Sequence, residues 1–104
     1  MKKIIATILL LSACLFTFAQ KGRIEGRVYN QKTNEPLKFA SVQIQGTLIG
    51  ATTNIDGNFV FTDIDPSFVR LIVSYVGFET TLSPEVHVQG NQTTFIDIAL
   101  PESS

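Results

Sequence analysis

The chain has 104 residues, a formal net charge of −1 and 44% hydrophobic residues, which is enough for one domain with an apolar core. Its eight basic residues are scattered among nine acidic ones, which excludes the basic patch that nucleic-acid binding needs. The single cysteine excludes an intrachain disulfide, so packing alone must stabilise the fold.

The N-terminus is typical of a secretory leader. Lys2 and Lys3 precede an uncharged apolar run at residues 4–18, which is short of the ~20 residues that a membrane span needs. Small residues before Gln20 predict cleavage there. We therefore expect a signal peptide at 1–19, a mature domain at 20–104, and no transmembrane segment in the mature chain.

The leader has a second interpretation. Leu11-Ser12-Ala13-Cys14 is similar to a bacterial lipobox, in which Cys14 would be lipidated and become the first mature residue. The apolar residues that follow Cys14 favour ordinary cleavage, because a lipoprotein normally turns polar at this point.

Alternating apolar residues predict the first two mature strands, at 23–29 and 40–45. The stretch 30–36 between them is polar and rich in turn formers. The residues expected to face the core are Ile24 and Val28 in the first strand, and Ala40, Val42 and Ile44 in the second.

Asp56-Gly57 is the best hairpin signal in the chain, because Gly57 can adopt a positive φ without a Cβ clash. A weaker strand at 48–53 precedes this turn. In the strand that follows, Phe59 and Phe61 alternate with polar residues, so both rings should point into the core.

The second half of the chain predicts three further strands. They are a long central strand at 68–76, a strand at 78–82 after Gly77, and a final strand at 95–100. The stretches 63–66 and 84–92 are expected to be loops. The inward residues are Val69, Leu71, Val73 and Tyr75, then Phe78, Thr80 and Leu82, and finally Ile96, Ile98 and Leu100.

These segments amount to about seven short strands with frequent turn signals, and no window has helical periodicity. The sequence therefore predicts an all-β fold, an antiparallel Greek-key β-sandwich.

Candidates for nucleophilic catalysis are few. His87, the only histidine, is expected in an exposed loop. It could form a Ser-His-Asp arrangement with Ser74 or Ser83, but neither serine lies in a Gly-x-Ser-x-Gly elbow. We therefore predict that the protein is not an enzyme, and we assign no catalytic residue.

The acidic residues near the turn offer two further hypotheses. Asp63 and Asp65 could act as paired carboxylates, but both fit solvated turn positions better. Thr52, Asn54, Asp56 and Asp63 fall on the offsets of a calcium loop, but the first position lacks a carboxylate and the last lacks a bidentate glutamate. We assign no metal-binding or cofactor-binding residue and expect no cofactor.

The mature chain is rich in threonine, glutamine and asparagine, which predicts an uncharged polar surface. Exposed strand edges of this kind can pair with another strand or bind a glycan, but ordinary solubility of a sandwich domain is the favoured interpretation.

Several stretches resemble a known family, the carboxypeptidase regulatory-like domain, which is a small transthyretin-like β-sandwich. They are Glu35-Pro36-Leu37, Ala40-Ser41-Val42-Gln43-Ile44 and the segment from Gly50 to Phe61. In addition, Val73-Ser74-Tyr75-Val76-Gly77-Phe78 resembles a segment found where such a domain forms the N-terminal extension of TonB-dependent outer-membrane receptors. The resemblance covers roughly residues 22–100.

This resemblance implies a non-enzymatic accessory module, exported to the periplasm and associated with the outer membrane. It would be the N-terminal extension of a nutrient-uptake receptor, or a fragment from one, with a protein partner such as the receptor barrel, its plug or an assembly factor. The alternative is a stand-alone exported domain, lipid-anchored if Cys14 is modified, that binds a glycan or a protein.

Overall fold

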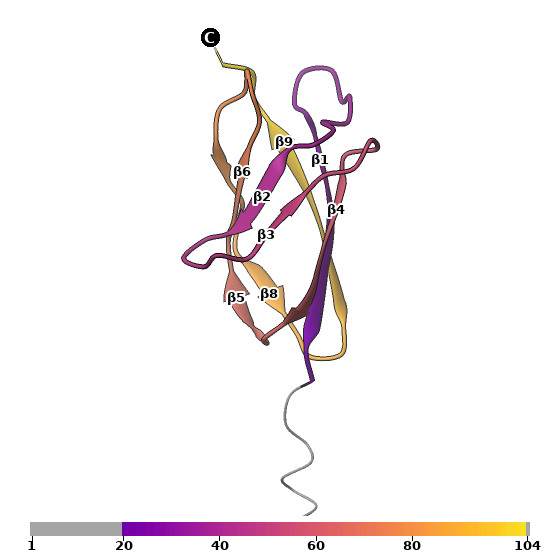
Figure 1. Ribbon diagram of the computed structural model, residues 1–104, viewed down its shortest axis with the longest axis vertical. Coiled ribbons are helices and arrows are strands. Elements are labelled where there is room, and N and C mark those ends of the chain that lie inside the picture. Colours follow the sequence, from indigo (N-terminus) through magenta and orange to yellow (C-terminus); the bar gives the residue numbers. More distant parts are fainter. Residues whose placement is uncertain (1–19, 104) are drawn as a thin grey trace, which may run out of the picture.

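The computed structural model describes residues 20–103. The predicted signal peptide at 1–19, with its alternative modification at Cys14, lies outside these residues. Within them every regular element is a β-strand (Figure 1). The strands are β1 (Gly22–Asn30), β2 (Ser41–Ile44), β3 (Gly50–Thr52), β4 (Asn58–Ile64), β5 (Ser67–Val69), β6 (Leu71–Ser74), β7 (Thr81–Leu82), β8 (Val86–Val88) and β9 (Thr93–Leu100).

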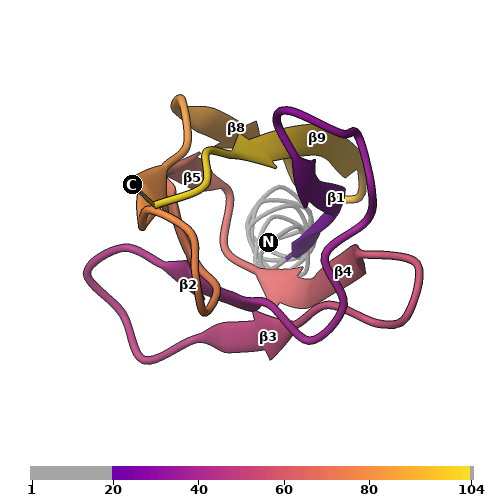
Figure 2. The same ribbon diagram turned by 90° about the horizontal axis from the view of Figure 1, so that it is seen from above.

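The strands form two main sheets and one small one. The first main sheet has the order β4-β1-β9, the second has the order β3-β2-β6-β7, and β5 pairs with β8. Seen from above, the strands surround a common core (Figure 2). This arrangement confirms the predicted all-β sandwich.

The pairing of the first and last strands is parallel, whereas every other named strand pair in residues 20–103 is antiparallel. The pairing runs from Arg23 opposite Thr93 to Asn30 opposite Leu100. Because β1 lies between β4 and β9, it is the central strand of its sheet. Alternation within each strand could not reveal the parallel direction of this pair.

The predicted inward faces of the first strands are confirmed. Alternate residues of β1, β2, β4 and β9 point into one hydrophobic core. The rings of Phe59 and Phe61 are 2% and 3% exposed and meet edge to face, with their centroids 5.9 Å apart. Their neighbours in the core are Ile24, Val28, Ala40, Val42, Ile44, Leu71, Val73, Ile98 and Leu100.

The Asp56-Gly57 turn is confirmed, but the predicted hairpin is wrong. β3 and β4 belong to different sheets, so the turn carries the chain from one sheet to the other. The turn docks on β1, because the Val28 N–H donates to the Gly57 carbonyl at 2.7 Å. This contact with β1 takes the place of strand pairing across the turn.

The predicted strand at 68–76 is divided. Ser67–Val69 pairs with β8, while Leu71–Ser74 pairs with β2, and Arg70 lies at the change of partner. Side chains continue to alternate through this change, so the periodicity gave no sign of it. The central position predicted for this segment is confirmed for β6, which lies between β2 and β7.

The predicted loops contain additional strand residues. Val86 and Val88, in the expected loop 84–92, form β8 and are buried against the core. Asp63 and Ile64, in the expected loop 63–66, extend β4. Asp63 has φ 57° where the β1–β4 register shifts, which fits a bulge that turns Ile64 inward.

The inward face predicted for 78–82 is wrong beyond Phe78. Thr80 and Leu82 are exposed, whereas Ser83 is buried. The Ser83 hydroxyl accepts a hydrogen bond from the Leu71 N–H and donates one to the Pro84 carbonyl, both at 2.8 Å. These two bonds satisfy a buried hydroxyl, and they fix Ser83 in the interior where the leucine was expected.

Replacing Phe59 or Phe61 with alanine is expected to lower the free energy of unfolding by ~3 to 5 kcal/mol, because each change removes a buried ring. Phe95→Ala is the matched control, since this ring is 73% exposed, and it should change the value by no more than ~0.5 kcal/mol. Denaturant melts give the comparison. A cost below ~1 kcal/mol at both core positions would contradict the core described here.

Alanine substitutions at two glycines with similar φ allow the cost of a strained backbone to be measured separately from the cost of a steric clash. Gly46 and Gly57 have φ of 80° and 76°, but a Cβ at Gly57 would lie 2.6 Å from the Val28 carbonyl oxygen, whereas one at Gly46 would meet nothing within 4 Å. Gly46→Ala should therefore cost ~1 kcal/mol, from the left-handed backbone alone. Gly57→Ala should cost at least ~1 kcal/mol more, because the backbone must also move. Equal losses in thermal melts would refute the docking of this turn on β1.

Candidate functional site

The residues considered for nucleophilic catalysis are not assembled into a site. His87 is exposed, as predicted, but it lies in β8 and not in a loop. Its ring stacks on Phe68, with centroids 4.3 Å apart, and its Nδ1 is 3.3 Å from the amide nitrogen of Gln89. The Ser83 hydroxyl is buried and bonded to backbone groups, while Ser74 pairs with Ser41 across β6 and β2.

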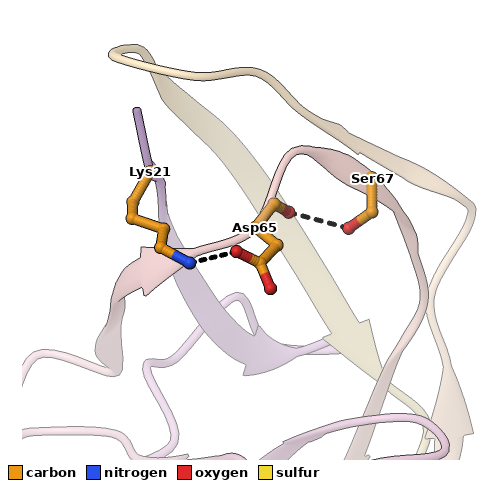
Figure 3. A network of polar contacts seen from close by, with 3 residues as sticks. All are labelled: Lys21, Asp65 and Ser67. Atoms are coloured by element: carbon orange, nitrogen blue, oxygen red, sulfur yellow. Dashed lines mark hydrogen bonds and ion pairs between the residues drawn. The ribbon is translucent and has the colours of Figure 1, made fainter. Parts of the chain in front are cut away.

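Of the two carboxylates near the end of β4, Asp63 is exposed and Asp65 makes a structural contact. Asp65 forms an ion pair with Lys21, and the Ser67 hydroxyl donates to the Asp65 carbonyl at 2.8 Å (Figure 3). These contacts join the chain before β1 to the corner between β4 and β5. Among residues 20–103, no group of three or more His, Cys, Asp or Glu side chains could hold a metal ion.

The positions considered for calcium belong to a self-contained turn. Asn54 Oδ1 accepts hydrogen bonds from the N–H groups of Asp56 and Asn58, each at 3.0 Å. The Gly57 N–H donates to the Asn54 carbonyl, also at 3.0 Å. The side-chain oxygen of Asn54 is therefore already used to close the turn.

The outer face of the β4-β1-β9 sheet has a charged groove of about 440 Å³. Arg27 lies between Asn58 and Asp97 on the neighbouring strands, and Glu25 lies between Val60 and Phe95. The groove is lined by Glu25, Gly26, Arg27, Asn58, Phe59, Val60, Phe95, Ile96 and Asp97.

The outer face of the other main sheet has a different character. A cleft of about 390 Å³ lies at one end of β2 and β6, and none of its lining residues is acidic, basic or histidine. Phe39, Tyr75 and Val76 supply its apolar walls, and Ser41 and Ser74 supply two hydroxyls from opposed positions on β2 and β6. This cleft combines exposed apolar groups with polar ones and is a second candidate site on the described chain.

Phe39 occupies the cleft in a strained backbone conformation. Its φ is 62°, a region that costs a bulky residue on the order of 1–3 kcal/mol. Buried Thr53 holds this conformation: its carbonyl accepts from the Phe39 N–H at 3.0 Å, and its hydroxyl accepts from the Ala40 N–H at 2.7 Å and donates to the Leu37 carbonyl at 2.6 Å. The ring nevertheless remains 64% exposed.

The opposite wall of the cleft is a tight turn after β6. Gly77 adopts φ 87°, and the rings of Tyr75 and Phe78 approach each other to 5.5 Å between centroids. The side chain of Val76 is left 94% exposed. Phe78 also forms a bridge to Glu102, which fixes the turn to the C-terminal segment of the described chain.

The sequence did not identify this cleft. No structural role was predicted for Phe39, because residue type alone does not indicate a positive φ at a phenylalanine. Val76 was expected to lie within the strand 68–76, but β6 ends at Ser74 and Val76 lies in the turn that follows. The sequence analysis singled out one segment at this site, Val73–Phe78. It did so because the segment resembles a known family, and it gave no indication of a surface cleft.

Comparisons with known proteins agree with the fold. The model of the CarboxypepD_reg-like domain family matches residues 24–104. A search of curated proteins gives no significant match. The described residues include no helix long and apolar enough to cross a membrane.

Similar solved structures include a chain of a cohesin–X-dockerin complex from Acetivibrio cellulolyticus, with a TM-score of 0.65 and 18% identity over 76% of this chain and 56% of that one. The group B streptococcus pilus 2b backbone protein has a TM-score of 0.67 and 13% identity over 81% and 42%. The Bacillus anthracis TIE protein has a TM-score of 0.67 and 12% identity over 80% and 17%.

This chain spans little more than half of the first of these structures and less than half of the other two. At such low identities the likeness shows a shared sandwich fold alone.

Removing the Asn54 side chain tests the turn against the calcium hypothesis. Asn54→Ala is expected to lower the free energy of unfolding by ~1 to 2 kcal/mol, because two N–H groups lose their acceptor. Asp56→Ala is the control and should have little effect. Both results should be the same in calcium and in a chelator. A rise in the wild-type melting midpoint on adding calcium would contradict this assignment.

Proposed function

The chain belongs to the CarboxypepD_reg-like domain family, and from this premise we propose that it is a non-enzymatic interaction module of a TonB-dependent outer-membrane receptor. In this role it would be exported and would face the periplasm as the receptor's N-terminal extension. It would contact the plug, the barrel or an assembly partner during nutrient uptake.

The observation that carries this proposal is the position of the Val73–Phe78 segment. This stretch resembles the receptor-associated form of the domain, and its second half forms the tight turn with Val76 at its tip. An exposed valine beside a fixed pair of aromatic rings suits contact with another protein, because such side chains lose water on association.

The surface chemistry supports a binding role over catalysis. Among the described residues, the acid–base candidates are separated or engaged in structural hydrogen bonds. The two grooves described above instead present aromatic and aliphatic groups next to hydrogen-bonding groups, a composition typical of recognition surfaces.

The receptor context is tested by fractionating cells that carry the native gene. An antibody against this domain should detect a polypeptide many times heavier than 11.4 kDa in the outer-membrane fraction, because the domain would be joined to a plug and barrel. A tagged periplasmic protein and a known barrel serve as fractionation controls.

A species of 11.4 kDa or less as the only reactive band would refute the receptor proposal. If that species is periplasmic, or associates with the membrane until Cys14 is replaced by alanine, the alternative is a stand-alone binding domain. Its ligand search would then include glycans as well as proteins.

A further inference from the structure

The free edge of β9 is the longest unprotected strand edge on the described chain. β9 runs for eight residues without proline, glycine or lysine, and its register with β1 is unbroken. β4, at the other edge of the same sheet, has a bulge at Asp63. The remaining edge strands, β3, β5, β7 and β8, have two or three residues each. Proteins commonly protect sheet edges with short strands, bulges, prolines or lysines, and β9 has none of these devices.

The hydrogen bonds at the two ends of the β1–β9 ladder show which groups face this edge. The carbonyls of Gln92 and Leu100 both accept from N–H groups of β1 or of the residue after it. In a parallel ladder this phase directs the N–H and C=O groups of the even-numbered residues of β9 to β1. The odd-numbered residues direct theirs to the free edge, where no other backbone group of residues 20–103 bonds to them. They are Thr93, Phe95, Asp97 and Ala99.

Side-chain burial shows that the first half of this edge is uncovered. Thr94 and Ile96 point to the inner face of the sheet, yet both are only half-buried. Ile24, which lies beside Thr94 on β1, is fully buried. A further strand beside β9 would complete the burial of Ile96 and would bond to the odd-numbered residues. The edge therefore calls for an extended backbone as its partner.

β9 is complementary to itself in one antiparallel register. A two-fold axis through Ile96 places Phe95 opposite Asp97 of a second copy, and Thr93 falls opposite Ala99 in the same way. All four edge-facing residues then meet residues with equally free N–H and C=O groups. The two half-buried Ile96 side chains meet on the inner face. Asp97, the one charged residue of β9, avoids its own copy, whereas an axis through Asp97 would oppose two carboxylates.

A second copy also suits this edge better than a flexible peptide does. β9 is already extended and held by eight paired positions on β1, so neither strand would lose backbone freedom on pairing.

We propose that β9 pairs with β9 of a second copy of this chain in this antiparallel register, which joins two three-stranded sheets into one continuous sheet. The inference goes beyond the receptor role proposed above and does not rest on it. A stand-alone domain and the extensions of two receptors could pair in the same way, so the failure of one proposal leaves the other in place.

Sedimentation velocity of the purified chain over a range of concentrations tests for the dimer, and a reversible, concentration-dependent dimer is expected. Asp97→Pro is the decisive variant, because the Asp97 N–H faces the free edge and its removal breaks no bond to β1. By symmetry the dimer loses two hydrogen bonds, so its dissociation constant should rise at least about twentyfold.

Asp97→Ala is the matched control. It keeps the N–H and removes the same exposed carboxylate, so the dissociation constant should stay within about fivefold of the wild-type value. Melting midpoints measured at concentrations where the chain is monomeric should be similar in the two variants, which separates a loss of pairing from a loss of folding.

Disulfide cross-linking tests the register without the proline variant. Single cysteines are introduced in a Cys14→Ala background, because Cys14 is the chain's own cysteine. In the proposed dimer the Cα atoms of the two Ile96 residues would lie about 4.5 Å apart, within the range of a disulfide. Those of the two Thr94 residues, on the same face, would lie about 14 Å apart. Ile96→Cys should therefore form a linked dimer on mild oxidation, and Thr94→Cys should not.

Three results would overturn the proposal. A chain that stays monomeric at the highest soluble concentrations would leave this edge to a strand of another protein. A dimer that Asp97→Pro leaves unchanged would place the interface elsewhere. Cross-linking of Thr94→Cys as readily as Ile96→Cys would exclude the register.

Discussion

The parallel pairing of β1 with β9 is the constraint on which the rest of the structure depends. β1 lies between β4 and β9 in their sheet, and its eight paired positions with β9 join segments about seventy residues apart. The Arg23 N–H donates to the Gln92 carbonyl at one end, and the Gln31 N–H donates to the Leu100 carbonyl at the other, each at 3.0 Å. Such distant contacts carry a loop-closure cost that slows folding.

This pairing also fixes the position of the Gly77 turn, which carries Val76 of the candidate site. Because β1 and β9 run in the same direction, the described chain begins at one end of the sandwich and finishes at the other (Figure 1). The chain after β9 reaches the Gly77 turn, where Phe78 bridges Glu102 and the Ser103 N–H donates to the Gly77 carbonyl at 2.9 Å. The wall of the cleft that carries Val76 is thus anchored to the last strand, while its floor comes from the central β2–β6 pair.

Alternation predicted most of the core from sequence, because a strand with one buried face repeats every two residues. Ile24, Val28, Phe59 and Phe61 were all placed correctly. Alternation could not predict which strands pair. It continues unchanged through Arg70, where the strand partner changes, and it is the same for parallel and antiparallel pairs. The strand Val86–Val88 was missed because three residues between polar neighbours give too short a pattern.

The cleft was missed for a different reason. Its shape depends on the left-handed backbone at Phe39, which is imposed by hydrogen bonds from Thr53, a residue fourteen positions away. Phenylalanine rarely adopts a positive φ, so residue type predicts an ordinary backbone at the position that shapes the cleft. A conflict between local preference and the folded structure is what a binding surface with stored strain should show.

The most direct test of the binding account is site-specific photo-crosslinking in the cell, with a photoreactive amino acid in place of Val76 and, separately, in place of Ile55. Both positions are highly exposed, but only Val76 lines the cleft. The account predicts a discrete cross-linked protein from position 76 that disappears with Phe39→Gly, and none from position 55. Equal cross-linking from both positions, or a product from position 76 that persists in Phe39→Gly, would contradict it.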